Sequence, residues 1–185
     1  YPCKDLRHKF LLAQESGAEE LTEVALPEGF EIIQLPGHFF DMVGFRTPDD
    51  VVYLADCLSS RETLEKYRIG FIYDIAAYPE TLEMVKTLEA KMFVPAHAPA
   101  AEDVSELAQY NIDTVKEIGD RITDILKEPQ CFEQLLQRLF KEYGLTMNFE
   151  QYVLVGSTVR SYLSWLNDLG RIEAVFEDSM LYWKA

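Results

Sequence analysis

Two of the three histidines in the chain follow short apolar runs that have the character of β-strands. His38 comes after Phe30–Leu35, and His97 comes after Met92–Val94, while Asp56 closes a third apolar run. Because the carboxyl ends of strands in an α/β sheet meet where the loops converge, we expect these three side chains to lie together. Neutral imidazole suits zinc or iron, and a carboxylate can bridge two cations. Single histidines near strand ends are also commonly structural, so residue types alone leave metal binding and a structural role open.

The first hundred residues alternate strand-like runs with helical patterns, which is typical of an α/β unit. A capping-box pattern, Ser59-x-x-Glu62, predicts a short helix to about Tyr67. Pro79 lies where a first-turn proline belongs and predicts a helix to about Ala90. A further short helix is expected within residues 3–16. Strands are expected at Leu21–Leu26, Phe30–Leu35, residues 45–47, Val51–Ala55 (covered on both faces), Gly70–Tyr73 and Met92–Val94.

Long amphipathic patterns dominate after residue 100. Apolar positions that recur every three or four residues predict helices over about 102–127, 132–143 and 149–169. Residues 172–176 and 180–183 are expected to form a terminal hairpin that turns at Glu177–Ser179. We therefore divide the chain into an α/β part, residues 1–100, and a helical, winged-helix-like tail, residues 101–185.

The composition excludes several classes of partner. The chain has 185 residues, with 32 Asp and Glu against 17 Lys and Arg, for a net charge of −15. Nucleic acid is therefore not an expected partner, because clustered basic side chains drive binding to phosphate backbones. The apolar runs are too short for a bilayer, so no membrane partner is expected either. Three cysteines without metal-type spacing indicate reduced thiols in a cytoplasmic protein.

Three segments, taken in order, resemble the latter half of the metallo-β-lactamase fold superfamily. They are Leu35-Pro36-Gly37-His38, the run from Val51 to Asp56, and Val94-Pro95-Ala96-His97. Residues 70–99 are similar to hydrolases of this superfamily that carry a helical, winged-helix-like tail. The resemblance implies a mixed α/β (α+β) fold: the second half of an αββα sandwich, followed by the helical tail.

The resemblance also implies roles for the three residues. His38 would ligate a first metal ion, Asp56 would bridge two ions, and His97 would ligate the second. The ions would be two divalent cations, zinc in the first place, with iron or manganese as alternatives. The implied activity is attack of an activated water on an ester, thioester, phosphodiester or amide of a small-molecule substrate.

One part of the family pattern is absent from the sequence. The family has a His-x-His-x-Asp-His motif that supplies the other metal ligands, and no such motif occurs here. We therefore expect the chain to be the carboxyl-terminal part of a longer hydrolase, with the missing amino-terminal half as its partner. Metal binding by the chain alone should be weak or lacking, and the chain alone should be inactive.

Several residues near the three are secondary candidates. Phe39 and Phe40 stand where the family commonly has Thr-Pro, and they would form an apolar pocket wall or pack in the core. Asp74 would contact a metal ligand and orient it, or cap the following helix or loop. Asp41 would orient a ligand in the same way, or be a solvated carboxylate in a loop. Cys57 would approach the metals, although a buried thiol beneath the site is the more common use of such a residue.

Two other functions remain open from the sequence. The first is a non-catalytic interaction or dimerisation module whose metal site has degenerated. The second is a flavodiiron-like oxidoreductase, which residues 157–185 disfavour because they contain no flavin-binding phosphate loop. Strands missing from the sheet would leave an unpaired edge, so a homo-oligomer is also expected.

Overall fold

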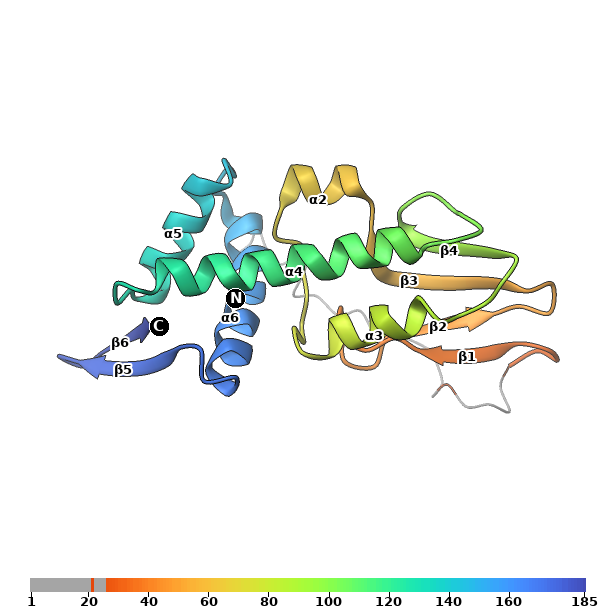
Figure 1. Ribbon diagram of the computed structural model, residues 1–185, viewed down its shortest axis with the longest axis horizontal. Helices are drawn as coiled ribbons and strands as arrows, with labels where there is room; N and C mark the ends of the chain where they lie inside the picture. Colours follow the sequence, from red (N-terminus) through yellow and green to blue (C-terminus); the bar gives the residue numbers. More distant parts are fainter. Residues whose placement is uncertain (1–20, 22–25) are drawn as a thin grey trace.

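The computed structural model describes Leu21 and residues 26–185. The helix expected within residues 3–16 lies outside the described residues, as does most of the strand expected over 21–26. A four-stranded sheet forms one end of the molecule (Figure 1). Its strands, in spatial order, are β1 (Glu31–Gln34), β2 (Val43–Arg46), β3 (Val51–Ser59) and β4 (Met92–His97).

The strand directions decide which residues share an edge of the sheet. β1 pairs antiparallel with β2, β2 pairs antiparallel with β3, and β3 pairs parallel with β4. β1, β3 and β4 therefore run in the same direction, and their carboxyl ends lie at one edge. The hairpin expected between β2 and β3 is confirmed, with Asp50 in the left-handed region at φ 66°.

Three helices accompany the sheet: α2 (Arg61–Tyr67), α3 (Ala77–Val85) and α4 (Ser105–Ile125). α3 and α4 pack against each other and against β3. The residue that caps α2 is Ser60 rather than Ser59, because the Ser60 hydroxyl accepts the hydrogen bond from the Thr63 amide. None of the helices in the described range is both long and apolar enough to cross a membrane.

The other end of the molecule contains α5 (Phe132–Glu142), α6 (Phe149–Asp168) and a two-stranded hairpin, β5 (Glu173–Glu177) with β6 (Met180–Lys184). These elements confirm the helices and hairpin expected after residue 100. α4 runs from the sheet to this end and packs against α5 and α6 (Figure 1). The hairpin turns at Asp178 and Ser179, both at positive φ, as a two-residue turn of this type requires.

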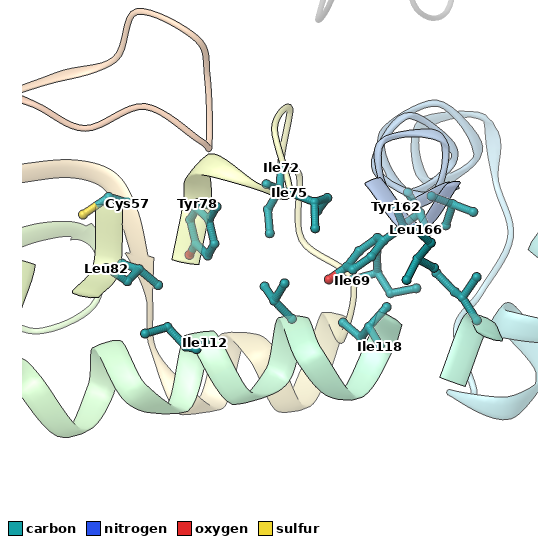
Figure 2. Close-up of a cluster of buried hydrophobic side chains, with 14 of the residues drawn as sticks. Cys57, Ile69, Ile72, Ile75, Tyr78, Leu82, Ile112, Ile118, Tyr162 and Leu166 are labelled. Carbon is teal, nitrogen blue, oxygen red and sulfur yellow. The ribbon is translucent and has the colours of Figure 1, made fainter. Parts of the chain in front are cut away.

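A single buried apolar cluster extends through both ends of the molecule. On the sheet side it contains Cys57 and Leu82, and on α4 it contains Ile112 and Ile118 (Figure 2). It continues without interruption to Tyr162 on α6. α4 therefore contributes apolar side chains to the core beneath the sheet and to the core of the tail. The division at residue 100 remains a prediction from the sequence pattern.

Two expectations about strands were wrong. Residues 70–73 form a loop, because their amides find partners outside any sheet: the Ile72 amide donates to the Thr158 hydroxyl and the Tyr73 amide donates to the Gly37 carbonyl. β3 is not covered on both faces by the described residues, since Tyr53 is 47% exposed. Val52 and Leu54, the residues on either side of Tyr53, face the core. The uncovered face of β3 is therefore the one that points away from α3 and α4.

Candidate metal site at the sheet edge

His38, Asp56 and His97 meet at the edge where the carboxyl ends of β1, β3 and β4 lie. His38 Nε2 is 3.6 Å from one carboxylate oxygen of Asp56, and His97 Nε2 is 3.5 Å from the other. Both distances exceed a normal hydrogen bond. Metal–ligand bonds of about 2.0–2.1 Å place two ligands of one tetrahedral cation about 3.4 Å apart. The spacing therefore matches that of neighbouring ligands on a shared cation.

A strained residue aims Asp56 at this edge. The sequence suggested that Asp56 follows the end of its strand, but β3 continues to Ser59 and Asp56 lies within it. The register with β4 shifts on both sides of Ala55, which has a φ of 47°. Such a bulge redirects the following side chain, and the left-handed region is unfavourable for alanine.

Gly37 places His38 between β1 and β2. Its φ is +128°, and a Cβ atom at this position would lie 2.5 Å from the Tyr78 Cα. Only glycine fits such a close backbone approach. The Gly37 carbonyl accepts hydrogen bonds from the Tyr73 and Asp74 amides, and the His38 ring meets Phe71 edge-on at 5.4 Å. The turn is therefore fixed by the loop after α2.

α6 in turn holds that loop. The Ile72 amide donates to Thr158 Oγ1 at 3.1 Å, and Ser161 Oγ donates to the Tyr73 carbonyl at 2.8 Å. Thr158 is fully buried. The tail thus contacts the loop that positions His38. Sequence reasoning did not identify Thr158 or Ser161, because small hydroxyl residues within an apolar helix carry no distinguishing signal.

Asn111 on α4 fixes the other side of the site. Its side-chain oxygen accepts from the Ser59 amide and the Tyr78 hydroxyl, and its amide group donates to the Ser59 and Leu107 carbonyls. Ser59 pairs with His97 across the β3–β4 ladder. Asn111 therefore holds the end of β3 beside His97. The signal for this residue was a polar side chain on the apolar face of the 102–127 pattern.

The surroundings keep His38 in the form that binds metals. Burial lowers the pKa of His38 below its usual value, the Asp56 charge opposes this shift, and His97 adds to it. The imidazole is therefore neutral at pH 7, with a lone pair available. Beneath the site, burial raises the pKa of Cys57 to about 12. Cys57 is fully buried in the core, as the sequence analysis favoured, and remains a protonated thiol.

The three residues supply fewer protein ligands than a complete dinuclear metal centre has. The two histidines lie on different oxygens of Asp56, so each of two cations would receive one imidazole and one carboxylate oxygen. Catalytic zinc usually has about three protein ligands. Among residues 26–185, no group of three or more His, Cys, Asp or Glu side chains is arranged to hold a metal ion by itself. The three residues fit half of a dinuclear site.

The secondary candidates lie around this centre. Asp74 Oδ1 accepts hydrogen bonds from the Ala76 and Ala77 amides, so its carboxylate satisfies backbone amides at the start of α3. Asp41 is exposed in the turn that follows Phe40. A role for either aspartate in orienting a ligand remains a prediction.

Phe39, Phe40 and Tyr73 form an exposed aromatic group beside His38. The two phenylalanine ring centroids are 4.4 Å apart, and Tyr73 lies 5.7 and 5.6 Å from them. Neither phenylalanine packs in the core, so the alternative of core packing is wrong. A role for Phe39 and Phe40 as a wall facing the substrate remains a prediction.

A cavity of about 490 Å³ opens beside the two histidines. Side chains from α2, the loop at residues 69–72, α4 and α6 line it, together with His38 and His97. Exposure falls from His97 (57%) through His38 (23%) to the fully buried Tyr162, so the cavity runs from the surface into the core. Its volume is typical of small-molecule sites, which span roughly 300–1,000 Å³.

Solved structures with the same arrangement of elements identify the fold. A metallo-beta-lactamase family protein from Thermus thermophilus superposes with a TM-score of 0.65 at 15% identity, over 84% of this chain and 49% of that one. The chain has the metallo-β-lactamase fold. A beta-lactamase domain protein from Burkholderia ambifaria gives a TM-score of 0.60 at 14% identity, over 86% and 51% of the two chains.

This chain therefore spans about half the length of these metallo-β-lactamase-fold structures. The amino-acid sequence itself matches no protein-family model and no curated protein. The likeness thus rests on the arrangement of helices and strands. It agrees with the fold that the order of the three sequence segments suggested.

Proposed function

We propose that this chain is the carboxyl-terminal part of a dinuclear metallohydrolase, in which His38, Asp56 and His97 supply half of the metal ligands. The observation that supports this most strongly is the placement of one imidazole on each oxygen of a single carboxylate. The metallo-β-lactamase fold, and the half-length match to its solved members, agree with the proposal.

Each residue has a distinct task in this proposal. Asp56 bridges the two cations, and the neutral imidazoles of His38 and His97 each hold one of them. Two divalent cations, zinc foremost, would lower the pKa of water and polarise a carbonyl or phosphoryl oxygen. The remaining ligands come from residues outside the described part of the chain, in a longer polypeptide that contains both halves of the fold.

Metal titration tests the ligand assignment on the chain itself. Isothermal calorimetry with Zn²⁺ should detect weak binding, because each cation has about two of its usual three protein ligands. His38→Ala, Asp56→Asn and His97→Ala should each reduce the affinity at least tenfold, with Asp56→Asn affecting both cations. His8→Ala is the matched control and should leave the affinity unchanged. Equal affinity in all four variants would contradict the assignment.

Hydrolysis tests the activity in the longer polypeptide. Ester, thioester, phosphodiester and amide substrates should reveal one preferred class, and Asp56→Asn should lower its rate at least a hundredfold, because it disturbs both cations. A metal-free, inactive full-length protein would favour the non-catalytic interaction module. Iron content together with flavin-dependent reduction of oxygen would favour the oxidoreductase.

A further inference from the structure

We propose that the cavity beside His38 and His97 binds a linear apolar acyl chain of the substrate, and that the Tyr162 hydroxyl donates a hydrogen bond to an oxygen near the far end of that chain. The inference rests on the proposed function, because it takes the two histidines as the reacting end. It narrows the substrate to an ester or thioester of a medium-length, oxygen-bearing fatty acid.

The apolar side chains in the lining of the cavity favour an apolar occupant. Leu64, Ile69, Val115 and Ile118 are among the apolar side chains that face it, and all four are buried. The one cationic side chain at the cavity, Arg68, donates to the Glu117 carboxylate at 2.6 and 2.7 Å. A phosphodiester would therefore find no free positive charge among the side chains that line this cavity, whereas a hydrocarbon chain would find apolar surface along its length.

Among the polar side chains that line the cavity, Tyr78 and Thr114 are engaged in hydrogen bonds within the described residues, whereas the buried Tyr162 hydroxyl is not. The Tyr78 hydroxyl donates to Asn111 Oδ1 at 3.2 Å, and Thr114 Oγ1 donates to the Tyr110 carbonyl at 2.8 Å. The Tyr162 hydroxyl has no hydrogen-bond partner within the part of the chain that the structure describes, although the residue is fully buried. A buried hydroxyl without a partner costs free energy, so such a group calls for a bound partner.

Tyr162 is a fully buried residue of the cavity lining. Figure 2 shows the ring reaching from α6 toward α4, with its oxygen directed away from α6. Burial raises the pKa of Tyr162 well above its usual value, so the hydroxyl keeps its proton and is available as a donor. An oxygen atom on the substrate chain is the matching acceptor.

Binding measurements with neutral amides test the apolar part of this inference without added metal. In calorimetric titrations, the affinity should rise about fourfold for each methylene from hexanamide to decanamide, as expected for burial of hydrocarbon. Leu154→Trp places a bulky side chain in the lining of the cavity and should abolish binding. Val153→Trp, one position earlier on α6 and outside the lining, should leave it unchanged.

A second pair of variants tests the hydrogen bond. Wild-type protein should bind ω-hydroxydecanamide about three- to tenfold more tightly than decanamide. Tyr162→Phe keeps the ring and should remove this preference. Tyr143→Phe is the matched control, because the Tyr143 hydroxyl is also buried without a partner in the described residues but does not line the cavity. It should retain the preference.

Two results would overturn the inference: no binding of either amide, or a preference for the hydroxylated amide that persists in Tyr162→Phe. These titrations contain no metal, so their failure would leave the ligand assignment of His38, Asp56 and His97 intact. Conversely, loss of the metal assignment would leave amide binding as a measured property of the cavity. The two proposals can therefore fail separately.

Discussion

Ala55 shows how a single residue sets the direction of the side chain that follows it. Its φ of 47° turns the chain so that the following carboxylate, Asp56, lies between the two histidines. A side chain in this region of the backbone costs roughly 1–2 kcal/mol. The cost falls on the residue next to Asp56, and strain of this kind is common at functional sites.

Ala55→Gly should therefore stabilise the protein. Relief of the left-handed alanine exceeds the entropic cost of glycine, so the free energy of unfolding should rise by up to about 1 kcal/mol. Ala108→Gly, within α4, is the control that makes the same chemical change and should lower it by about 1 kcal/mol. Urea denaturation of both variants measures the two values. A loss of stability in Ala55→Gly would contradict the strain assigned to this residue.

Gly37→Ala should have the opposite effect at the neighbouring turn. The added Cβ would lie 2.5 Å from the Tyr78 backbone at a φ of +128°, so a loss of about 3 kcal/mol is expected. Gly170→Ala is the control, because its φ is also positive but nothing lies within 4 Å, and it should lose only about 1 kcal/mol. Chemical denaturation compares the two. Equal losses would show that the contact with Tyr78 is not restrictive.

Residue types and order alone predicted the three residues that meet, since each followed an apolar run and two of the runs ended in Pro-Gly-His or Pro-Ala-His. They did not predict the bulge at Ala55, because alanine gives no sign that it adopts a glycine-like conformation. They also did not predict the roles of Asn111 and Thr158, whose partners are 52 and 86 residues away. Such long-range hydrogen bonds depend on tertiary structure.

At the scale of elements, the loop that carries Phe71 and Tyr73 links α6 to the turn of His38. The short apolar run at residues 70–73 predicted a strand, but tertiary contacts overrode this preference. In a strand, the Ile72 amide would donate to a neighbouring strand. Here it donates to the Thr158 hydroxyl instead. Longer amphipathic patterns were predicted more reliably, because α4, α5 and α6 each repeat the helical spacing several times.

Thr158→Val tests this link. The substitution keeps the side-chain shape but leaves the buried Ile72 amide without its acceptor, so a loss of about 1–3 kcal/mol is expected. Thr123→Val is the control, because the Thr123 hydroxyl donates only to the Gly119 carbonyl of its own helix. It should change stability by less than about 0.5 kcal/mol. Thermal unfolding measures the stability of both variants. Equal losses would contradict the inference that α6 helps to hold the loop that positions His38.

At the scale of the whole molecule, one apolar cluster joins the sheet, α4 and the tail. The sequence pattern suggested a boundary near residue 100, where short runs give way to long helices. α4 begins at Ser105, just after this boundary, and packs against the sheet as well as the tail, with buried side chains such as Ile112 and Ile122 along its length. A change of pattern along a sequence does not show whether the two regions share a core.

We therefore expect the described residues to unfold as one unit. Native-state hydrogen exchange should give similar free energies of opening for the most protected amides of β3 and α6, because a shared core couples them. Denaturant dependence of exchange checks this. Amides of α6 that open at a much lower free energy than those of β3 would show that the tail unfolds by itself.

In the proposed metal centre, His38 and His97 bind metal on either side of Asp56. The most direct measurement is nitrogen-15 NMR of the histidine side chains during titration with Zn²⁺, since the chain has only three histidines. We predict saturable shifts of the His38 and His97 imidazole signals, no shift for His8, and loss of both shifts in Asp56→Asn. Shifts confined to His8, or His38 and His97 signals that Zn²⁺ leaves unchanged, would contradict it.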